Sequence, residues 1–363
     1  MNRAEQLRRE MAADQLDAFV ITTPANRRYL SGFTGSSGVL IITPQQAFLV
    51  TDFRYVEQAN RESPGWALYK QEKGLDDSVA DLLNKLAPAR VGFEADHLTV
   101  ASYAKLRGAM PHDTVWVSTE GAVRDLRAVK GAEEIDHIRA AQQIADRLFE
   151  ALPTLIQPGR TERAVAWEIE QRLRHEGADG PSFPVIVASG PNSALPHHRP
   201  TEREIQPNEI VLTDFGATYN GYQSDCTRTW FTGEPTDDYR RRYAWVYEAL
   251  HMGQAALAVG APLREADQAV RDHFDAVGQL AHFGHSLGHG VGLEVHEMPS
   301  LSFRMPEEKR FAADNVVTVE PGLYYLGWGG IRLENLVHLT DHGVEILSGT
   351  PFGPDLWREG QRG

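Results

Sequence analysis

Short apolar runs separated by turn residues dominate the first third of the chain. Three of them, residues 18–23 (AFVITT), 39–44 (VLIITP) and 47–52 (AFLVTD), have the length and the apolar, partly β-branched content of buried strands. A helical stretch is expected from Tyr55 onward, and residues 90–106 repeat the alternation of a short strand with a helix. This pattern predicts a mixed sheet with helices.

Apolar stripes at helical spacing begin near residue 132. The stripe expected to face a core consists of Ile135, Ile138, Ala141, Ile144, Ala145 and Leu148. A second helix should start after the N-cap Thr161 and stop at Gly177, and a third should cover residues 237–258. The strand-like runs between and after the helices are residues 209–216, 222–231, 315–325 and 331–340. The second part is therefore predicted to be α+β, an antiparallel sheet with helices on its outer face.

Length and composition support two domains in a chain of 363 residues, 42% of them hydrophobic. The predicted boundary near Val129 gives domains 1–129 and 130–363. The single cysteine, Cys226, excludes an internal disulfide and favours a reducing compartment, so a cytoplasmic location is expected. Neither a signal-peptide core nor an apolar run of membrane-spanning length is present. The net charge of −14 disfavours binding to nucleic acid or to anionic lipid.

A hairpin signal brings the first candidate carboxylates together. Asn220-Gly221 separates two strand-like runs and is typical of a two-residue turn. Residues that face each other then have numbers summing to 441, so Asp214 faces Thr227 and Asp225 lies diagonally on the same face, roughly 7–8 Å away. Such a pair can hold two cations, although two surface aspartates on a half-exposed hairpin would give the same pattern.

The segment HFGHSLGHGVGLEVHEMP contains four histidines and several glycines within 18 residues. Glycines at this density let a backbone approach a ligand closely. His289 and His296 are seven positions apart, which places them on one side of a helix but on opposite faces of a strand. They are therefore expected to serve one site from different positions rather than as a paired ligand set.

Two apolar runs in residues 315–334 end in or near Glu320 and Glu334, with a glycine-rich connection between them. A carboxylate at the end of a buried strand needs a partner, because an unpaired buried charge is costly. The available partners are metal ions or Arg332. The combined candidate ligands are Asp214, Asp225, His289, Glu320 and Glu334, a set that suits manganese, cobalt or zinc better than an ion that prefers thiolates.

The order and spacing of these five residues resemble the family of methionine aminopeptidase, prolidase and aminopeptidase P. The matching motifs are TDFG (Asp214), SDCTRT (Asp225), GHGVGLEVHE (His289), VEPGLY (Glu320) and RLEN (Glu334). RYLSGFTGSSG and TDFRY resemble the additional domain of the proline-specific members and of creatinase. The resemblance implies a pita-bread metallopeptidase domain at residues 130–363 after a creatinase/prolidase-like α/β domain at residues 1–129. It also implies two divalent metal ions per chain and a homodimer.

The resemblance further implies hydrolysis of the Xaa-Pro bond in small peptides that have proline at the second position. Asp225 and Glu334 would bridge the two metals, Asp214 would complete one ion, and His289 and Glu320 the other. The metals would lower the pKa of a shared water and polarise the scissile carbonyl.

The same resemblance suggests roles for residues around the metals. Glu320 is the candidate general base, and His197 and His296 would donate hydrogen bonds to the substrate and the developing oxyanion. Arg332 would fix neighbouring carboxylates. His285 would contribute a wall of the site or a hydrogen bond.

Three functions remain open on the sequence: an Xaa-Pro dipeptidase, which is favoured, an aminopeptidase P for longer peptides, and a non-catalytic binding module, which the complete ligand set disfavours. A dipeptidase needs a cation for the free carboxylate of its substrate, and Arg54 in TDFRY is a candidate, as is Arg27 or Arg28. Strand alternation turns Cys226 away from the metal face, which disfavours a thiol nucleophile. Trp328 would line a pocket for the proline ring or belong to the core.

Overall fold

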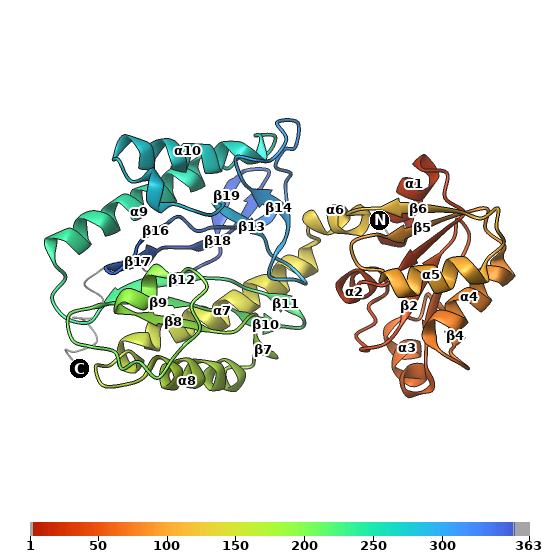
Figure 1. The fold of residues 1–363 in the computed structure, drawn as a ribbon, viewed down its shortest axis with the longest axis horizontal. Helices are drawn as coiled ribbons and strands as arrows, with labels where there is room; N and C mark the ends of the chain where they lie inside the picture. Colours follow the sequence, from red (N-terminus) through yellow and green to blue (C-terminus); the bar gives the residue numbers. More distant parts are fainter. Residues whose placement is uncertain (1–2, 351, 353–363) are drawn as a thin grey trace. The chain divides into compact units, whose positions relative to one another are not determined.

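The computed structural model describes residues 3–350 and 352, which belong to two compact units that divide between Arg127 and Ala128 (Figure 1). The helices of the first unit are α1 (Arg3–Ala13), α2 (Pro24–Ser31), α3 (Val56–Glu62), α4 (Leu75–Leu86), α5 (Val100–Ala109) and α6 (Ala122–Ala128), with the 3-10 helix η1 (Phe53–Tyr55). Its strands are β1 (Ala18–Ile21), β2 (Val39–Ile42), β3 (Ala47–Thr51), β4 (Ala67–Lys70), β5 (Arg90–Glu94) and β6 (Val115–Thr119).

The strands of the first unit form one mixed sheet in the order β4-β3-β2-β1-β5-β6. The three predicted strands are confirmed as β1, β2 and β3, and β2 pairs antiparallel with both β1 and β3. Helix α2 was not predicted, because it is short and lies between two strands. Its signals are Pro24 in the first turn and Gly32 at the C-cap, which has a left-handed φ of 80°.

The second unit is α+β. Its helices are α7 (Ala132–Leu155), α8 (Glu162–His175), α9 (Asp237–Ala255) and α10 (Leu263–Ala276), with the 3-10 helices η2 (Gly190–Ala194) and η3 (Leu280–His282). Its strands up to residue 231 are β7 (Gly180–Pro181), β8 (Ile186–Ser189), β9 (Ile210–Asp214), β10 (Ala217–Tyr219), β11 (Tyr222–Gln223) and β12 (Thr227–Phe231). The later strands are β13 (Gly288–Gly290), β14 (Glu297–Leu301), β15 (Val316–Val319), β16 (Gly322–Tyr325), β17 (Gly329–Arg332), β18 (Asn335–Thr340) and β19 (Gly343–Ile346).

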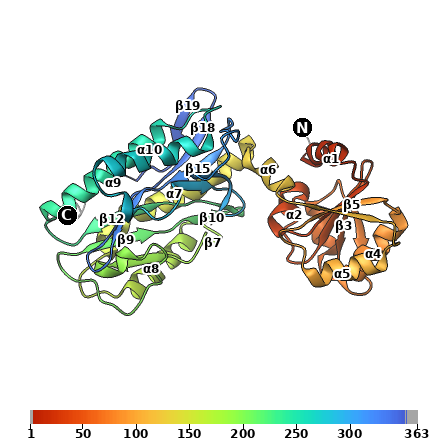
Figure 2. The ribbon, with the colours of Figure 1, turned by 45° about the horizontal axis from the view of Figure 1, so that its top comes forward.

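Helices cover the strands of the second unit from both sides, as Figures 1 and 2 show. Helices α9 and α10 pack with β15, β17 and β18 into one hydrophobic core. Helices α7 and α8 pack with β8, β9 and β12 into a second core, in which the rings of Phe149 and Phe215 stack 4.1 Å apart. The stripe predicted on the first long helix is buried along its whole length. Within residues 3–350, no helix is both long and apolar enough to cross a membrane.

The hairpin register predicted around Asn220-Gly221 is confirmed. Thr218 pairs with Gln223, and Asp214 pairs with Thr227, so both pairs sum to 441. The turn residues have φ angles of 45° and 69°, the left-handed values that a type I′ turn requires. The hairpin is interrupted beyond the turn: β10 and β11 belong to a sheet with β7, whereas β9 and β12 pair in a sheet with β8.

The segment between Glu320 and Glu334 belongs in part to the predicted strands 315–325 and 331–340, each of which is divided in two. It folds into the antiparallel hairpin β16–β17, which forms a two-stranded sheet of its own. Strands β15 and β18 on either side of the hairpin pair with each other in the five-stranded sheet β14-β13-β15-β18-β19. The hairpin therefore returns the chain to the sheet that it left, and Glu320 and Glu334 lie at the same end of this strand pair.

Candidate metal centre and substrate cavity

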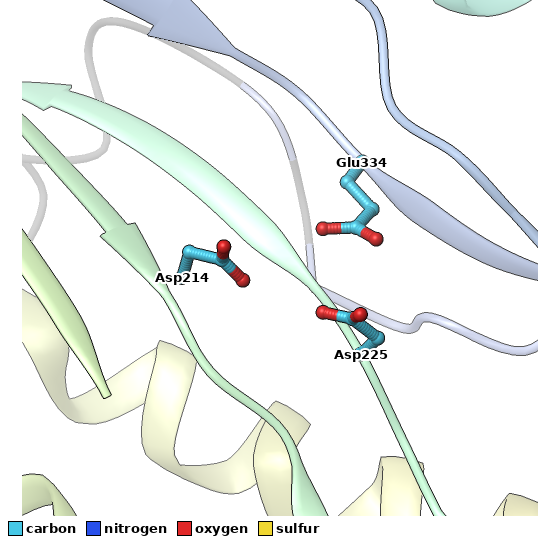
Figure 3. Close-up of side chains that lie close together, drawn as sticks. All are labelled: Asp214, Asp225 and Glu334. Carbon is cyan, nitrogen blue, oxygen red and sulfur yellow. The ribbon is translucent and has the colours of Figure 1, made fainter. Parts of the chain in front are cut away.

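Three buried carboxylates meet where strands of the second unit end or begin. Asp214 is the last residue of β9, Asp225 precedes β12 and Glu334 precedes β18. Each offers an oxygen, and these oxygens lie within 4.8 Å of one another. Figure 3 shows the three carboxylates pointing toward one another. This arrangement is that of a candidate cation site.

The carboxylates of this cluster lie so close together that a bound cation would stabilise their ionised forms. Burial and the charges of Glu334 and Asp214 raise the pKa of Asp225 well above its usual range. Burial and the charges of Glu320 and Asp214 do the same for the pKa of Glu334. Oδ1 of Asp214 and Oε1 of Glu334 are buried without a hydrogen-bond partner among the described residues. Crowded oxygen donors with unused lone pairs fit divalent metal ions.

Arg332 and Thr227 hold two of the carboxylates in place. Nη2 of Arg332 donates to Oδ2 of Asp214 at 2.5 Å, and Nε of Arg332 donates to Oγ1 of Thr227 at 2.9 Å. The Thr227 hydroxyl in turn donates to Oε2 of Glu334 at 2.7 Å. One guanidinium thus fixes Asp214 directly and Glu334 through a neutral hydroxyl, which leaves the other oxygens of both carboxylates available.

His289 and Glu320 extend the cluster. Nδ1 of His289 donates a hydrogen bond of 3.1 Å to the carbonyl oxygen of Gly290, so Nε2 faces the site. Nε2 lies 3.3 Å from Oε1 of Glu320 and 3.6 Å from Oδ2 of Asp225. Burial alone would raise the pKa of Glu320, but the hydrogen bond and charge of His289 lower it to about 2. At His289, burial alone would lower the pKa, but the hydrogen bond and charge of Glu320 raise it.

A cavity of about 430 Å³ opens onto these groups. Its lining residues are Phe183, Pro184, Ile186, Pro196, His197, His198, Arg199, Asp214, Asp225, His285, Ser286, Gly288, His289, His296, Ser300, Glu320, Arg332 and Glu334. Nine of the ten residues predicted for the site are therefore brought together around one cavity. The tenth, Arg54, belongs to the first unit, where it is exposed and forms a two-point ion pair with Asp52.

The histidines of the cavity have different surroundings. Nδ1 of His285 donates to the carbonyl of Ser286 at 2.8 Å, and Nε2 lies 3.0 Å from the hydroxyl of Tyr324. Burial lowers the pKa of His285, so its neutral ring accepts from that hydroxyl. The ring of His296 lies 4.2 Å from the ring of His289, and burial and the neighbouring His289 lower its pKa. His197 is exposed at the cavity wall.

Thr227 and Tyr324 also contact the site, although neither is among the predicted site residues. Thr227 was identified as the residue opposite Asp214, and this position already put its hydroxyl on the metal-facing side. Tyr324 accepts from Nη1 of Arg332 at 2.9 Å, a contact within the hairpin β16–β17, whose separate pairing the strand pattern does not predict.

The structure also shows the surroundings of Trp328 and Arg27, two residues for which the sequence leaves alternatives open. Trp328 packs against the hydrophobic core beneath Arg242, whose guanidinium lies 4.3 Å from the ring centre, and it does not line the cavity. Arg27 is buried and donates to the carbonyls of Gly35 and Gly38, so it serves the packing of the first unit.

Fold and site together define an α+β metallopeptidase with a separate N-terminal α/β domain. Residues 136–341 match the model of metallopeptidase family M24, and residues 3–129 match the creatinase/prolidase N-terminal domain. The chain belongs to family M24 and has its pita-bread fold.

Similar proteins match over almost the whole chain. An Xaa-Pro dipeptidase of Pyrococcus furiosus is 33% identical over 96% of this chain and 98% of its own length. The structure of an Xaa-Pro dipeptidase from Bacillus anthracis has 40% identity and a TM-score of 0.93, covering 97% and 98% of the two chains. That of an X-Pro aminopeptidase from Thermotoga maritima has 34% identity and a TM-score of 0.88 over the same shares.

Proposed function

We propose that this protein is an Xaa-Pro metallopeptidase that releases the N-terminal residue of small peptides, with Xaa-Pro dipeptides as its preferred substrates. The observation that carries the proposal is the convergence of Asp214, Asp225, Glu334, His289 and Glu320 on one cavity within a family M24 fold. The names of the similar dipeptidases and of the similar aminopeptidase support the same bond specificity. A complete set of ligands argues against a non-catalytic binding module.

Five residues would hold two divalent ions, which we expect to be manganese, cobalt or zinc. Asp214, Asp225 and Glu334 would supply oxygens from within 4.8 Å of one another, and His289, which lies beside Asp225 and Glu320, would complete the set together with Glu320. When bound, such ions make a water more acidic and polarise the scissile carbonyl.

The chain's own groups would then orient the peptide and move the proton. Glu320 faces the cavity beside His289 and would accept a proton from the attacking water and pass it to the proline nitrogen. That nitrogen belongs to a tertiary amide without an N–H, so it must gain a proton to leave as an amine. His197 and His296 would donate hydrogen bonds to the substrate carbonyl oxygen.

The remaining lining groups divide into an apolar wall and a polar one. Phe183, Pro184 and Ile186 provide an apolar surface that suits a proline ring. His285, whose two ring nitrogens are engaged by the carbonyl of Ser286 and the hydroxyl of Tyr324, would form part of the polar wall of the cavity.

The position of Arg199 supports a preference for dipeptides over longer peptides. It lines the cavity and is exposed, and within the described part of the chain it has no hydrogen-bond or ion-pair partner. A free guanidinium in this position suits the carboxylate that follows proline in a dipeptide, because the two groups can form a charge-assisted hydrogen bond. Arg54, the residue first expected in this role, stays a prediction, and an aminopeptidase P for longer peptides is the alternative.

The proposal is tested by release of the N-terminal amino acid from Xaa-Pro and Xaa-Pro-Yaa peptides. Chelated protein would be reconstituted with manganese, cobalt or zinc, and Asp225→Asn would serve as the matched control. We expect metal-dependent cleavage that the control lacks, faster for the dipeptide. Faster cleavage of the tripeptide would identify an aminopeptidase P, and no cleavage of either peptide by metal-loaded protein would reject the proposal.

A homodimer and a cytoplasmic location are further expectations, which light scattering and cell fractionation would check.

A further inference from the structure

One buried carboxylate outside the metal cluster has an unusually complete set of donors. Glu162 is fully buried at the first position of α8. Its Oε1 accepts from the backbone N–H of Ser189 (2.7 Å), from the Ser189 hydroxyl (2.8 Å) and from Nδ2 of Asn192 (2.9 Å). Its Oε2 accepts from Nε2 of His198 (2.8 Å), from the backbone N–H of Thr201 (3.0 Å) and from the Thr201 hydroxyl (2.8 Å).

These six donors come from the two ends of one segment, residues 189–201. Residues 196–199 of the same segment line the cavity, so His198 contacts Glu162 and also belongs to the cavity wall. Nη1 of Arg332 donates to the carbonyl of Pro196 at 3.4 Å from the metal side. Glu162 therefore ties both ends of a loop whose middle faces the candidate metal centre.

The charge of Glu162 suits this task. Burial alone would raise its pKa, but the hydrogen bonds from His198, Asn192 and Ser189 outweigh burial and lower the pKa to about 2. The N-terminus of α8 also favours an anion at this position. Since all six partners donate, a carboxylate satisfies them, whereas an amide would direct its own N–H groups at donors.

We propose that Glu162 is a positioning residue for peptide hydrolysis, which holds residues 189–201 so that His197 faces the substrate cavity. This inference rests on the proposed peptidase function. Glu162 does not line the cavity and acts through the loop, so its effect should appear in substrate use rather than in the metal centre.

The test is a double-mutant cycle of Glu162→Gln and His197→Ala, measured as kcat and KM on an Xaa-Pro dipeptide. We expect Glu162→Gln to lower kcat/KM by about 10-fold to 100-fold, because a misplacement of about 1 Å can cost that much. Metal stoichiometry should remain that of the wild type. In the His197→Ala background, the same substitution should cost much less, because the group that Glu162 positions is already absent.

Two further variants keep the test decisive. Thr201→Val removes one of the six donors and should lower kcat/KM less than Glu162→Gln does, again only when His197 is present. This milder variant keeps the proposal testable if Glu162→Gln fails to fold. Glu168→Gln alters another carboxylate of α8, which pairs with Arg160 and Arg172 away from the loop, and should leave kcat/KM unchanged.

The outcomes separate this inference from the function on which it rests. Inactive wild-type protein with two bound metals would overturn both. Active wild-type protein combined with an unchanged Glu162→Gln variant, or with losses that multiply fully in the double mutant, would overturn the positioning role alone.

Discussion

The hydroxyl of Thr227 donates a hydrogen bond of 2.7 Å to Oε2 of Glu334. The same oxygen of Thr227 accepts from Nε of Arg332, so a small neutral side chain separates a buried cation from a buried anion. Direct pairing of Arg332 with Glu334 would occupy oxygens that the candidate metal centre needs. The threonine instead orients the carboxylate and leaves Oε1 without a partner among the described residues.

Replacement of Thr227 by valine should therefore weaken metal binding. The variant keeps the shape of the side chain but removes one donor to Glu334 and one acceptor for Arg332, and loss of such supporting contacts typically lowers metal affinity about 10-fold to 100-fold. Titration calorimetry with manganese would measure the change. Thr213→Val is the matched control, since Thr213 is a buried threonine of β9 that accepts from Nε1 of Trp230. Equal affinity of the Thr227 variant and the wild type would contradict this role.

The register of the metal-bearing strands could be predicted because it depends on local chemistry. Asn220 and Gly221 tolerate left-handed backbone angles, and a two-residue turn then fixes every pair across the strands, including Asp214 with Thr227. The five candidate ligands were identified by their motifs, and the structure places them around one cavity.

The contacts that support the ligands could not be predicted in the same way. Glu162 follows an N-cap threonine, where an acidic residue usually serves only the helix dipole, and its partners lie 27 to 39 positions further along the chain. Hairpin β16–β17 places Tyr324 beside Arg332, although the strand pattern alone does not show that the two predicted strands divide and that these parts pair with each other. Long-range side-chain pairing leaves no periodic signal in a single sequence.

Removal of divalent ions should destabilise the second unit, because its buried carboxylates then repel one another. An ion at about 100 times its dissociation constant stabilises the folded state by about 2.7 kcal/mol, and the melting temperature should rise accordingly. Differential scanning calorimetry of chelated protein with and without manganese would measure the rise. Asp225→Asn removes one of the repelling charges. The chelated variant should therefore have a higher melting temperature than the chelated wild type, and added metal should raise its melting temperature less. A lower melting temperature for the chelated variant would contradict the repulsion.

Cys226 should be unreactive in the folded protein and dispensable for catalysis. Burial raises the pKa of its thiol, and Sγ is 3.5 Å from the carbonyl of Glu334 and 3.2 Å from Nη1 of Arg228. Iodoacetamide should leave native protein unmodified and active, as mass spectrometry and the peptide assay would show. The same reagent should modify the cysteine fully in concentrated denaturant. Rapid loss of activity with modification of the native protein would disprove this prediction.

Glu162 should make stability depend on pH in a defined direction. Its pKa falls from 4.5 to about 2 on folding, so the folded state favours the ionised form. The resulting stabilisation, about 3 kcal/mol, is fully present above the unfolded value of 4.5 and is lost as pH falls toward 2. The difference in unfolding free energy between metal-free wild type and Glu162→Gln, measured by urea unfolding, should therefore be largest near neutral pH and should disappear only as the pH approaches 2. A difference that stays constant with pH would exclude the charge as its cause.

Arg199 should determine how strongly the enzyme prefers a free carboxylate after proline. A hydrogen bond to a charged group contributes about 1.5–3 kcal/mol when sheltered from water, and the exposure of Arg199 reduces that value. Arg199→Gln should therefore lower kcat/KM for an Xaa-Pro dipeptide about threefold to tenfold, chiefly through KM, while an Xaa-Pro amide is cleaved as by the wild type.

The comparison of acid with amide isolates the charge of the substrate, because the two peptides share the scissile bond and the proline ring. Arg163→Gln is the control variant: Arg163 is an exposed arginine of α8 that pairs with Glu202 and does not line the cavity. If Arg199→Gln slows both peptides equally, the guanidinium supports the cavity wall rather than the substrate. The preference for dipeptides would then have to come from the size of the cavity or from a cation elsewhere, of which Arg54 is the predicted candidate.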